Sequence, residues 1–321
     1  MSKENNPQRR KKRVAVLLGG WSAEREVSLW SGRDCADALE KAGYDVTRID
    51  VTRDLRALID ALTPAPDAVF NALHGRGGED GTIQGVFEIA GKPYVGCDVL
   101  PSALAMDKDI AKSAFESAGI PTSRWRVVPG PEYRQDPGGT AASVLKELGS
   151  PVFVKPAELG SSVGISKAEN AAEAMRAIAL ALRYGEKVVV EEFISGREIE
   201  VAVLDGPRTA LPGEVHSAGD WYDYASKYED ERSDFEAPAR LPEQRMAEVR
   251  ALAARAFETL ECRGLARIDF FYVEGGRGFL INEVNTMPGF TPISGFPKMW
   301  AATGMTYAEL CNELVNLATA N

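Results

Sequence analysis

The feature that most constrains the fold is the succession of two apolar runs and the amphipathic segment between them in residues 13–51. RVAVLLGG begins at residue 13 and is short, apolar and closed by two glycines, whereas SLWSGRDCADALEKAG favours a helix that stops at Gly43. YDVTRIDV then favours a second strand. A strand, a helix and a strand in this order form a βαβ unit with parallel strands. The chain is therefore expected to begin with a parallel sheet.

The remainder of the chain divides into two further segments by its change of pattern. PDAVFNALHG and KPYVG add buried strands to the first domain, after which helical and strand patterns alternate more irregularly. We expect α/β architecture with α+β elements. The expected units are a disordered extension at 1–12, an N-terminal domain at 13–105, a central domain at 106–197 and a C-terminal domain at 198–321. Residues 219–239 are aromatic and charged without a regular period, which is typical of a long functional loop.

Charge and composition exclude several classes of function. The chain of 321 residues has 37 Lys and Arg against 47 Asp and Glu, a formal charge of −10, which argues against nucleic acid as the main partner. No span approaches 18 apolar residues, so we expect no membrane segment and a cytoplasmic protein. The four cysteines are far apart and there are only two histidines, so we expect reduced structural thiols and no zinc site.

The segment GLARIDFFYVEGGRGFLINEVN, residues 264–285, reads as a hairpin that gathers polar side chains on one face. With a turn near Gly276, Asp269 lies opposite Glu283 and Arg267 opposite Asn285. Two opposed carboxylates need a neutralising group, and with an amide oxygen they are ligands that suit Mg²⁺ carrying phosphates. The alternative is a structural network in which Arg267 and lysines neutralise the acids. The pattern leaves both possibilities open.

Two other stretches have features suited to a nucleotide. FVKPAELGSSVGI places Lys155 at a strand end before a loop of small residues, where backbone N–H groups and hydroxyls could approach phosphate oxygens. The loop is not a Walker A motif, and a plain Gly-Ser turn is an equal alternative. VVVEEFISGREIE could present backbone groups at Glu191, Glu192 and Phe193 to an adenine and Glu198 to a ribose, although such a stretch is usually only a linker.

Taken together, these stretches resemble the D-alanine–D-alanine ligase family of the ATP-grasp superfamily, from about residue 13 onward. The resemblance rests on seven motifs in order: LLGGWSAEREVSL, ALHGRGGEDGTIQG, SALAMDK, VKPAELGSSVG, YDYASKY, ARIDF and NEVNTMPGFTPIS. It implies an ATP-grasp fold, with a Rossmann-like N-terminal domain and two α+β domains that clamp ATP. It also implies the cofactors and partners of such an enzyme: ATP, two Mg²⁺ ions or Mn²⁺, two D-alanine molecules and a second copy of the chain.

The resemblance implies a reaction for cell-wall precursor synthesis. The carboxylate of the first D-alanine attacks the γ-phosphate to give an acyl phosphate, and the amine of the second D-alanine displaces phosphate. Positioning and charge stabilisation carry most of such a reaction.

The resemblance also implies roles for individual residues. Metal binding would fall to Asp269, Glu283 and Asn285. Nucleotide binding would fall to Lys108, Lys155, Ser162, Glu191, Glu192, Phe193, Ile194, Glu198, Lys227 and Asn282. Substrate binding and catalysis would fall to Glu24, Ser161, Tyr228, Arg267, Gly289 and Ser294.

Within the last set, the implied roles differ. Glu24 would bind the first substrate's ammonium, although from its position alone it reads as an acid near a helix N-terminus. Arg267 and the N–H of Gly289 would hold the oxyanion, and Ser294 the second carboxylate. Ser161, Glu24 and Tyr228 would tie the 219–239 loop over the substrates as a lid that excludes water.

Two positions stand apart from the pattern. His74 lies near the implied site, but a lone histidine before glycine is more often structural. Gly295 stands where a larger apolar residue such as Met or Leu is expected, so the second pocket is predicted to be looser.

Two other functions are compatible with parts of the sequence. One is an ATP-grasp ligase that joins a different pair of amino acids. The other is a non-catalytic dinucleotide-binding protein, which predicts GxGxxG after the first strand, whereas Gly19-Gly20 is followed by Trp-Ser-Ala-Glu.

Overall fold

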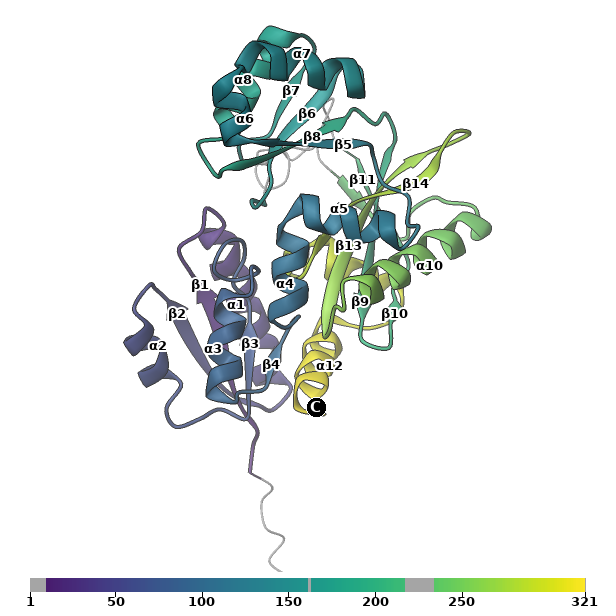
Figure 1. Cartoon of the computed structure of the whole chain (residues 1–321). Coiled ribbons are helices and arrows are strands. Elements are labelled where there is room, and N and C mark those ends of the chain that lie inside the picture. Colours follow the sequence, from purple (N-terminus) through teal and green to yellow (C-terminus); the bar gives the residue numbers. More distant parts are fainter. Residues whose placement is uncertain (1–9, 161–162, 217–233, 321) are drawn as a thin grey trace, which may run out of the picture.

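The computed structural model describes residues 10–160, 163–216 and 234–320, and it contains three sheets (Figure 1). Each sheet comes from a separate stretch of the chain, so that the purple, teal and green parts of Figure 1 follow one another in sequence. The predicted α/β class with α+β elements is confirmed. Among the described residues, no helix is both long and apolar enough to cross a bilayer.

The N-terminal sheet is parallel, as the βαβ pattern predicts, with the strand order β2-β1-β3-β4. Val14 and Val16 of β1 face one layer of the core, and Ala15 and Leu17 face the other, because successive side chains of a strand alternate. The strands are β1 (Arg13–Gly19), β2 (Asp45–Val51), β3 (Ala68–Asn71) and β4 (Tyr94–Val95). The helices are α1 (Arg25–Lys41), α2 (Leu55–Ala61) and α3 (Thr82–Ala90).

The last helix of the chain, α12 (Tyr307–Ala320), completes this N-terminal layer. Leu310 and Leu314 share one buried cluster with Val14 and Val16, on the side of the sheet that α1 covers. The hydroxyl of Tyr44 donates to the side-chain oxygen of Asn312 at 2.7 Å. The two ends of the chain therefore form one core.

The central sheet is antiparallel, with the order β5-β8-β6-β7, and lies at the top of Figure 1. Its buried valines and the helices on its outer face form a core of their own. The strands are β5 (Trp125–Pro129), β6 (Val152–Pro156), β7 (Ser166–Ala168) and β8 (Lys187–Glu192). The helices are α6 (Gly130–Gln135), α7 (Pro137–Leu148) and α8 (Ala171–Ala181).

The C-terminal sheet has the order β12-β11-β9-β13-β14, with β10 paired to β9. Its strands are β9 (Arg197–Leu204), β10 (Arg208–Thr209), β11 (Gly213–His216), β12 (Asp234–Glu236), β13 (Leu265–Val273) and β14 (Gly278–Asn285). Its helices are α10 (Glu243–Thr259) and α11 (Gly295–Ala302).

Two helices join the N-terminal sheet to the rest, α4 (Val99–Met106) and α5 (Lys108–Ser117). Ala111 and Phe115 of α5 are buried in the core of the C-terminal sheet, although they fall in the segment expected to form the central domain. The division at residues 105 and 197 stays a prediction. The packing shows that α5 contributes to the C-terminal core and α12 to the N-terminal core.

The predicted hairpin register is confirmed at the end that carries the polar residues. Asp269 pairs with Glu283, and Arg267 pairs with Asn285. Nearer the turn the register shifts by one, because Phe270 pairs with Ile281 and Asn282 is the extra residue of a bulge. A bulge re-aims the side chains next to it. The bulge at Asn282 thus changes the direction of side chains in β14 immediately before Glu283 and Asn285.

Candidate active site

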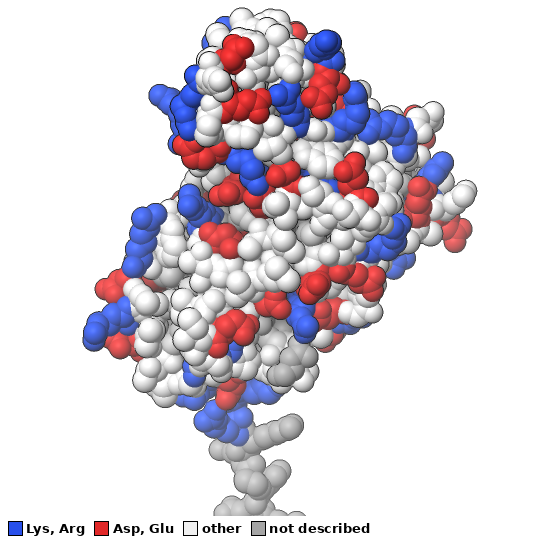
Figure 2. Space-filling model, viewed as in Figure 1, with Lys and Arg blue, Asp and Glu red and all other residues white. Residues whose placement is uncertain are grey.

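The predicted nucleotide and metal residues meet in the gap between the central and C-terminal sheets. Figure 2 shows acidic and basic side chains gathered along this gap, below the domain at the top of the view. The backbone N–H of Lys108 donates to Ala157 at 3.0 Å, which fixes the start of α5 against the end of β6. The side chain of Lys108 donates to the carbonyl of Leu159 at 2.6 Å and lies 3.9 Å from the Glu283 carboxylate.

A lysine cluster in this gap combines Lys108 and Lys112 of α5 with Lys155 and Glu191 of the central sheet. Nζ of Lys155 lies 3.1 Å from Oε2 of Glu191, and Nζ of Lys112 lies 3.6 Å from Oε1. Lys155 and Glu191 come from the antiparallel neighbours β6 and β8, whose pairing places them on one face. Sequence reasoning missed Lys112, which a helical spacing of four from Lys108 could have indicated.

In the lysine cluster, the pKa of Lys112 and the pKa of Glu191 each depend on burial and on the charge of the other residue. Burial lowers the pKa of Lys112 to about 8, although the neighbouring Glu191 favours the charged form. Its Nζ donates to Oγ1 of Thr122 at 2.9 Å and to Oγ of Ser123 at 2.8 Å. Burial would raise the pKa of Glu191, but Lys112 and Lys155 outweigh it and hold that pKa below its usual value. Oε1 of Glu191 has no hydrogen-bond donor among the described residues, so it is a buried acceptor.

The C-terminal side carries a hairpin cluster made of Glu200, Arg267, Asp269 and Glu283. The guanidinium of Arg267 donates to both oxygens of Asp269 at 2.7 Å, and its Nε lies 3.3 Å from the Glu200 carboxylate. Burial disfavours the charge on Arg267, yet Asp269 and Glu200 hold its pKa well above the usual value. A bidentate pair fixes the plane of the guanidinium. Arg267 is therefore a rigid cation at the edge of the gap.

The structure brings the three predicted metal ligands together on the hairpin. Nδ2 of Asn285 donates to Oδ2 of Asp269 at 2.9 Å, and Glu283 is the strand partner of Asp269. The salt-bridge alternative also has support, because Arg267 pairs with Asp269. Two carboxylates and an amide are a donor set that fits Mg²⁺ or Mn²⁺. The residues present thus fit a divalent cation, and Asp269 would exchange part of its pairing with Arg267 for the metal.

Three side chains of the N-terminal domain, Glu24, His74 and Glu79, lie near Arg267 of the hairpin cluster. Glu24 precedes α1, and its carboxylate is so close to Gly75 that a Cβ there would overlap Oε2. His74 is buried, with Nδ1 2.9 Å from the carbonyl of Met287 and Nε2 3.1 Å from Oγ of Ser31. Both ring nitrogens of His74 have partners, as the structural interpretation predicts.

Glu79 is a site residue that sequence reasoning missed. Its carboxylate accepts hydrogen bonds from the backbone N–H groups of Gly75 and, at 3.2 Å, of Met287. Burial, and then the charge of Glu24, raise the pKa of Glu79 to about 8, so the group is mainly protonated at pH 7. The signal was present, because Glu79 lies in the quoted motif ALHGRGGEDGTIQG.

The predicted oxyanion and carboxylate residues lie together in the loop before α11. Oγ of Ser294 lies 2.8 Å from Oγ1 of Thr291 and accepts the Thr291 backbone N–H at 3.1 Å. A Cβ placed on Gly289 would stand 3.3 Å from that Oγ, so a side chain there would fill the space beside Ser294. The structure therefore places Gly289 and Ser294 next to each other.

The expectation of a looser pocket at Gly295 is wrong at the position of the missing side chain. A Cβ on Gly295 would lie 2.7 Å from Oε2 of Glu200 and 2.9 Å from the Phe235 ring. Two other groups already fill that space. The sequence could not show this, because Phe235 and Glu200 come from other strands.

The predicted nucleotide residues of β8 and its continuation differ in their surroundings. Glu192 accepts from the backbone N–H of Arg124 at 2.7 Å and from Arg277 at 2.6 Å, so its side chain points away from the buried Glu191. The Phe193 ring centroid lies 6.0 Å from that of Phe153. Oδ1 of Asn282, the bulge residue, lies 3.4 Å from Nζ of Lys155.

Two more predicted nucleotide residues lie at the junction between the central and C-terminal sheets. Ile194 is half-buried and follows Phe193, whereas Glu198 lies in β9. Four predicted residues, Ser161, Ser162, Lys227 and Tyr228, and most of the predicted lid lie outside the described residues. Their roles stay predictions.

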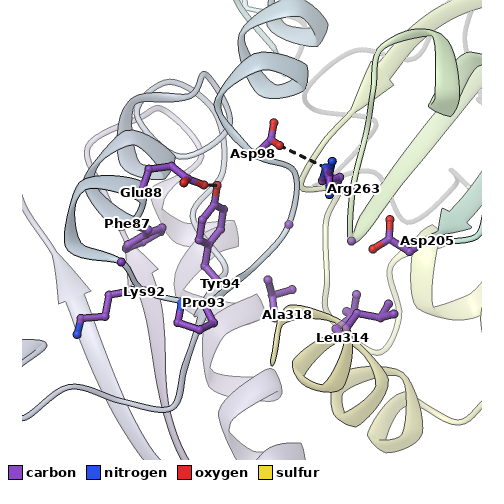
Figure 3. A pocket seen from close by; sticks show the side chains of 15 residues that line it. Phe87, Glu88, Lys92, Pro93, Tyr94, Asp98, Asp205, Arg263, Leu314 and Ala318 are labelled. Carbon is purple, nitrogen blue, oxygen red and sulfur yellow. Dashed lines mark hydrogen bonds and ion pairs between the residues drawn. The ribbon is translucent and has the colours of Figure 1, made fainter. Parts of the chain in front are cut away.

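Two other features lie apart from the predicted site. A cavity of about 380 Å³ lies between the N-terminal domain, α12 and the C-terminal segment near Arg263 (Figure 3), and none of the predicted site residues that the structure describes lines it. The Asp98–Arg263 ion pair of 3.5 Å lies at its edge. Glu214, His216 and Glu236 also converge, but Arg197 pairs with Glu214 at 2.6 Å and Arg240 with Glu236 at 2.6 Å. Arginine thus already neutralises those two acids.

Comparison with known proteins identifies similar chains over nearly the whole length. Two family models match: "D-ala D-ala ligase C-terminus" at residues 114–316 and "D-ala D-ala ligase N-terminus" at residues 55–97. A D-alanine–D-alanine ligase of Acidiphilium cryptum is 46% identical, with 96% of this chain and 98% of the relative covered. The one from Deinococcus radiodurans is 43% identical, again with 96% and 98% covered.

Solved structures agree with the sequence comparisons. The D-alanine–D-alanine ligase of Coxiella burnetii superposes with a TM-score of 0.83 at 31% identity, covering 97% of this chain and 94% of that chain. The VanG D-Ala:D-Ser ligase of Enterococcus faecalis has a TM-score of 0.83 at 32% identity, covering 96% and 100%.

Proposed function

Because the chain belongs to the D-alanine–D-alanine ligase family, we propose that it joins two D-alanines in an ATP-dependent reaction that supplies peptidoglycan synthesis. The observation that carries the proposal is the meeting of the lysine cluster and the hairpin cluster in one gap, where Lys108 lies 3.9 Å from Glu283. One cluster suits phosphates and the other a cation that neutralises them.

The lysine cluster would bind the nucleotide. Lys108 and Lys155 would touch the phosphates, and the backbone from Glu191 to Ile194 would contact the adenine, with Glu198 at the ribose. The buried Oε1 of Glu191 supports this role, since it lacks a donor in the part of the chain that the structure describes and a base amine would supply one. Because Lys112 and Lys155 keep Glu191 ionised, that acceptor would be a strong one.

The hairpin cluster would hold the divalent cations. Asp269, Glu283 and Asn285 would ligate two Mg²⁺ ions, or Mn²⁺, and Asn282 would lie beside them on the bulge. When bound, the ions would neutralise phosphate charge as the carboxylate attacks. The protein's own part is to keep three oxygen-bearing side chains on one face of a hairpin that the core of the sheet holds rigid.

The substrates would lie between the hairpin and the N-terminal domain. Glu24 would bind the ammonium of the first D-alanine, and the neutral Glu79 would limit the negative charge beside it. Arg267 and the N–H of Gly289 would hold the oxyanion of the tetrahedral intermediate, since Asp269 fixes the guanidinium plane. Ser294 would hold the second carboxylate.

The remaining assignments rest on the family alone. Ser161, Ser162, Lys227 and Tyr228 would complete the nucleotide and lid contacts, with 219–239 as the lid. We place the enzyme in the cytoplasm, where ATP and D-alanine are available.

A homodimer is also part of the proposal. Ile89 of α3 is 92% exposed, and Leu100 and Val99 at the start of the adjacent α4 are 50% and 38% exposed. Figure 2 shows the surface over α4 as mostly uncharged. An exposed apolar patch of this kind suits a second copy of the chain.

ADP release from Mg-ATP, measured with one amino acid at a time, tests the activity. We expect release with D-alanine and little with L-alanine, D-serine or D-lactate, and mass spectrometry should find the D-alanyl dipeptide. Release with several D-acids would indicate a different amino acid pair. No release with D-alanine would contradict the proposed function.

A further inference from the structure

The position of Gly295 raises the question of what fills the space beside Ser294 in place of a side chain. Gly295 begins α11 directly after Ser294, and a Cβ there would lie 2.9 Å from two ring carbons of Phe235. Real Cβ atoms essentially never come within 3.0 Å of another group, so residue 295 and Phe235 compete for one space. The ring occupies the volume that a Met or Leu would take.

Phe235 is held in this position from several sides. A Cβ on Gly213 of β11 would overlap the ring, so the glycine there lets the ring lie flat on its backbone. Nζ of Lys298 stands 5.9 Å from the ring centroid, which is a cation–π distance. The ring also packs on the buried cluster that contains Phe296 and Met299. The ring is therefore held in place from several sides, in β12, where the segment 219–239 rejoins the sheet.

The space beside Gly295 is also bordered by a charged group of the hairpin cluster. Oε2 of Glu200 would lie 2.7 Å from a Cβ on Gly295, and the same oxygen lies 3.3 Å from Nε of Arg267. A side chain at residue 295 would thus press on the carboxylate that helps to hold Arg267. Glycine at 295 and the ring at 235 form a matched pair that leaves the Glu200–Arg267 contact undisturbed.

We infer that Phe235 sets the size of the second substrate's side-chain pocket in this chain and takes over the part that a residue at 295 would play. The inference rests on the proposed function, because it places the second D-amino acid beside Ser294. Its chemical content is a limit on side-chain size. A methyl group fits against the ring, and a D-amino acid with a longer aliphatic side chain is rejected.

Four proteins test the inference: the wild type, Phe235→Ala, Gly295→Leu and the double variant. Each is assayed for dipeptide formation with D-alanine as donor and either D-alanine or D-2-aminobutyrate as acceptor. One methylene is worth about 10- to 200-fold in discrimination by an apolar pocket. We expect Phe235→Ala to reduce the preference for D-alanine as acceptor by about tenfold or more.

The double variant separates a shared space from a general loss of structure. Gly295→Leu alone should lower ligation with D-alanine and the urea midpoint, because the new side chain meets the ring and Glu200. In the Phe235→Ala background, Gly295→Leu should lower ligation and the urea midpoint much less. Selectivity for D-alanine as acceptor should also return in this double variant. Such non-additivity is the signature of two residues in contact.

Tyr94→Ala is the matched control, since it removes another half-buried ring at the remote cavity of Figure 3 and should leave acceptor selectivity unchanged. Unchanged selectivity in Phe235→Ala, or strictly additive effects in the double variant, would overturn the inference while leaving the ligase function intact. A wild type that forms no dipeptide from D-alanine would overturn the proposed function itself, and the pocket assignment with it.

Discussion

The lysine cluster and the hairpin cluster have opposite compositions although they lie across one gap. The first has three cations, Lys108, Lys112 and Lys155, and one carboxylate, Glu191, whereas the second has three carboxylates, Glu200, Asp269 and Glu283, and one arginine. Formally the named residues sum to +2 on one side and −2 on the other.

The difference teaches how the site is divided between its ligands. Buried charge of one sign is costly unless a partner neutralises it. Phosphates would neutralise the lysine cluster, and divalent cations the hairpin cluster. Helix α5 and the central sheet would thus supply one half of a binding site and the hairpin the other, and a metal–nucleotide complex would satisfy both halves at once.

The largest expected effect comes from weakening the hairpin cluster. Glu283→Gln keeps the shape of the side chain but removes one of the three negative charges, so turnover should fall about a hundredfold or more. Steady-state ADP release across a Mg²⁺ titration measures it. Near-normal activity at saturating Mg²⁺ would contradict the metal assignment and favour the structural salt-bridge alternative.

The next effect tests the lysine cluster through stability. Glu191→Gln leaves Lys112 and Lys155 close together and without their carboxylate, and breaking a buried ion pair costs about 3–5 kcal/mol. Urea unfolding should show this loss. Adding Lys112→Met should recover part of it, because the double variant buries one charge fewer. A double variant as unstable as the sum of the single ones would show that the two residues do not interact.

A third prediction concerns pH and the N-terminal side of the site. The pKa of Glu79 is raised from 4.5 to about 8, so between these values the folded state holds a proton that the unfolded state has released. The free energy of unfolding should therefore fall as pH rises through this window. Glu79→Gln should flatten that slope and also the alkaline limb of the activity profile. An unchanged slope would show that Glu79 is ionised at neutral pH in the folded protein.

The smallest effect belongs to an ion pair outside both clusters. Arg25 and Asp50 pair at 2.7 Å, but their side chains are 38% and 48% exposed. Water screens such pairs, so Asp50→Asn should leave the urea midpoint within error. If Asp50→Asn lowered the urea midpoint as much as Glu191→Gln does, burial would not explain why ion pairs in the two regions differ in strength.

The sequence by itself determined the local and near-local parts of the structure. The βαβ opening follows from hydrophobic patterning, and the opposition of Asp269 to Glu283 follows from a short hairpin whose turn fixes the register. The motifs also sufficed to indicate the family. Each of these depends on residues close together in the chain, where period and turn geometry leave few choices.

Tertiary structure alone decided which distant side chains share a space. Lys112 lies beside Glu191, Glu79 accepts from the N–H of Met287, and Phe235 fills the space beside Gly295. The residues of each pair are so far apart in the sequence that hydrophobic periodicity cannot predict their contact. The packing of α12 against the N-terminal sheet likewise joins residues from opposite ends of the chain. The physical reason is that burial and packing are properties of three-dimensional neighbours. A buried charge or a filled pocket exists only once the whole core has assembled.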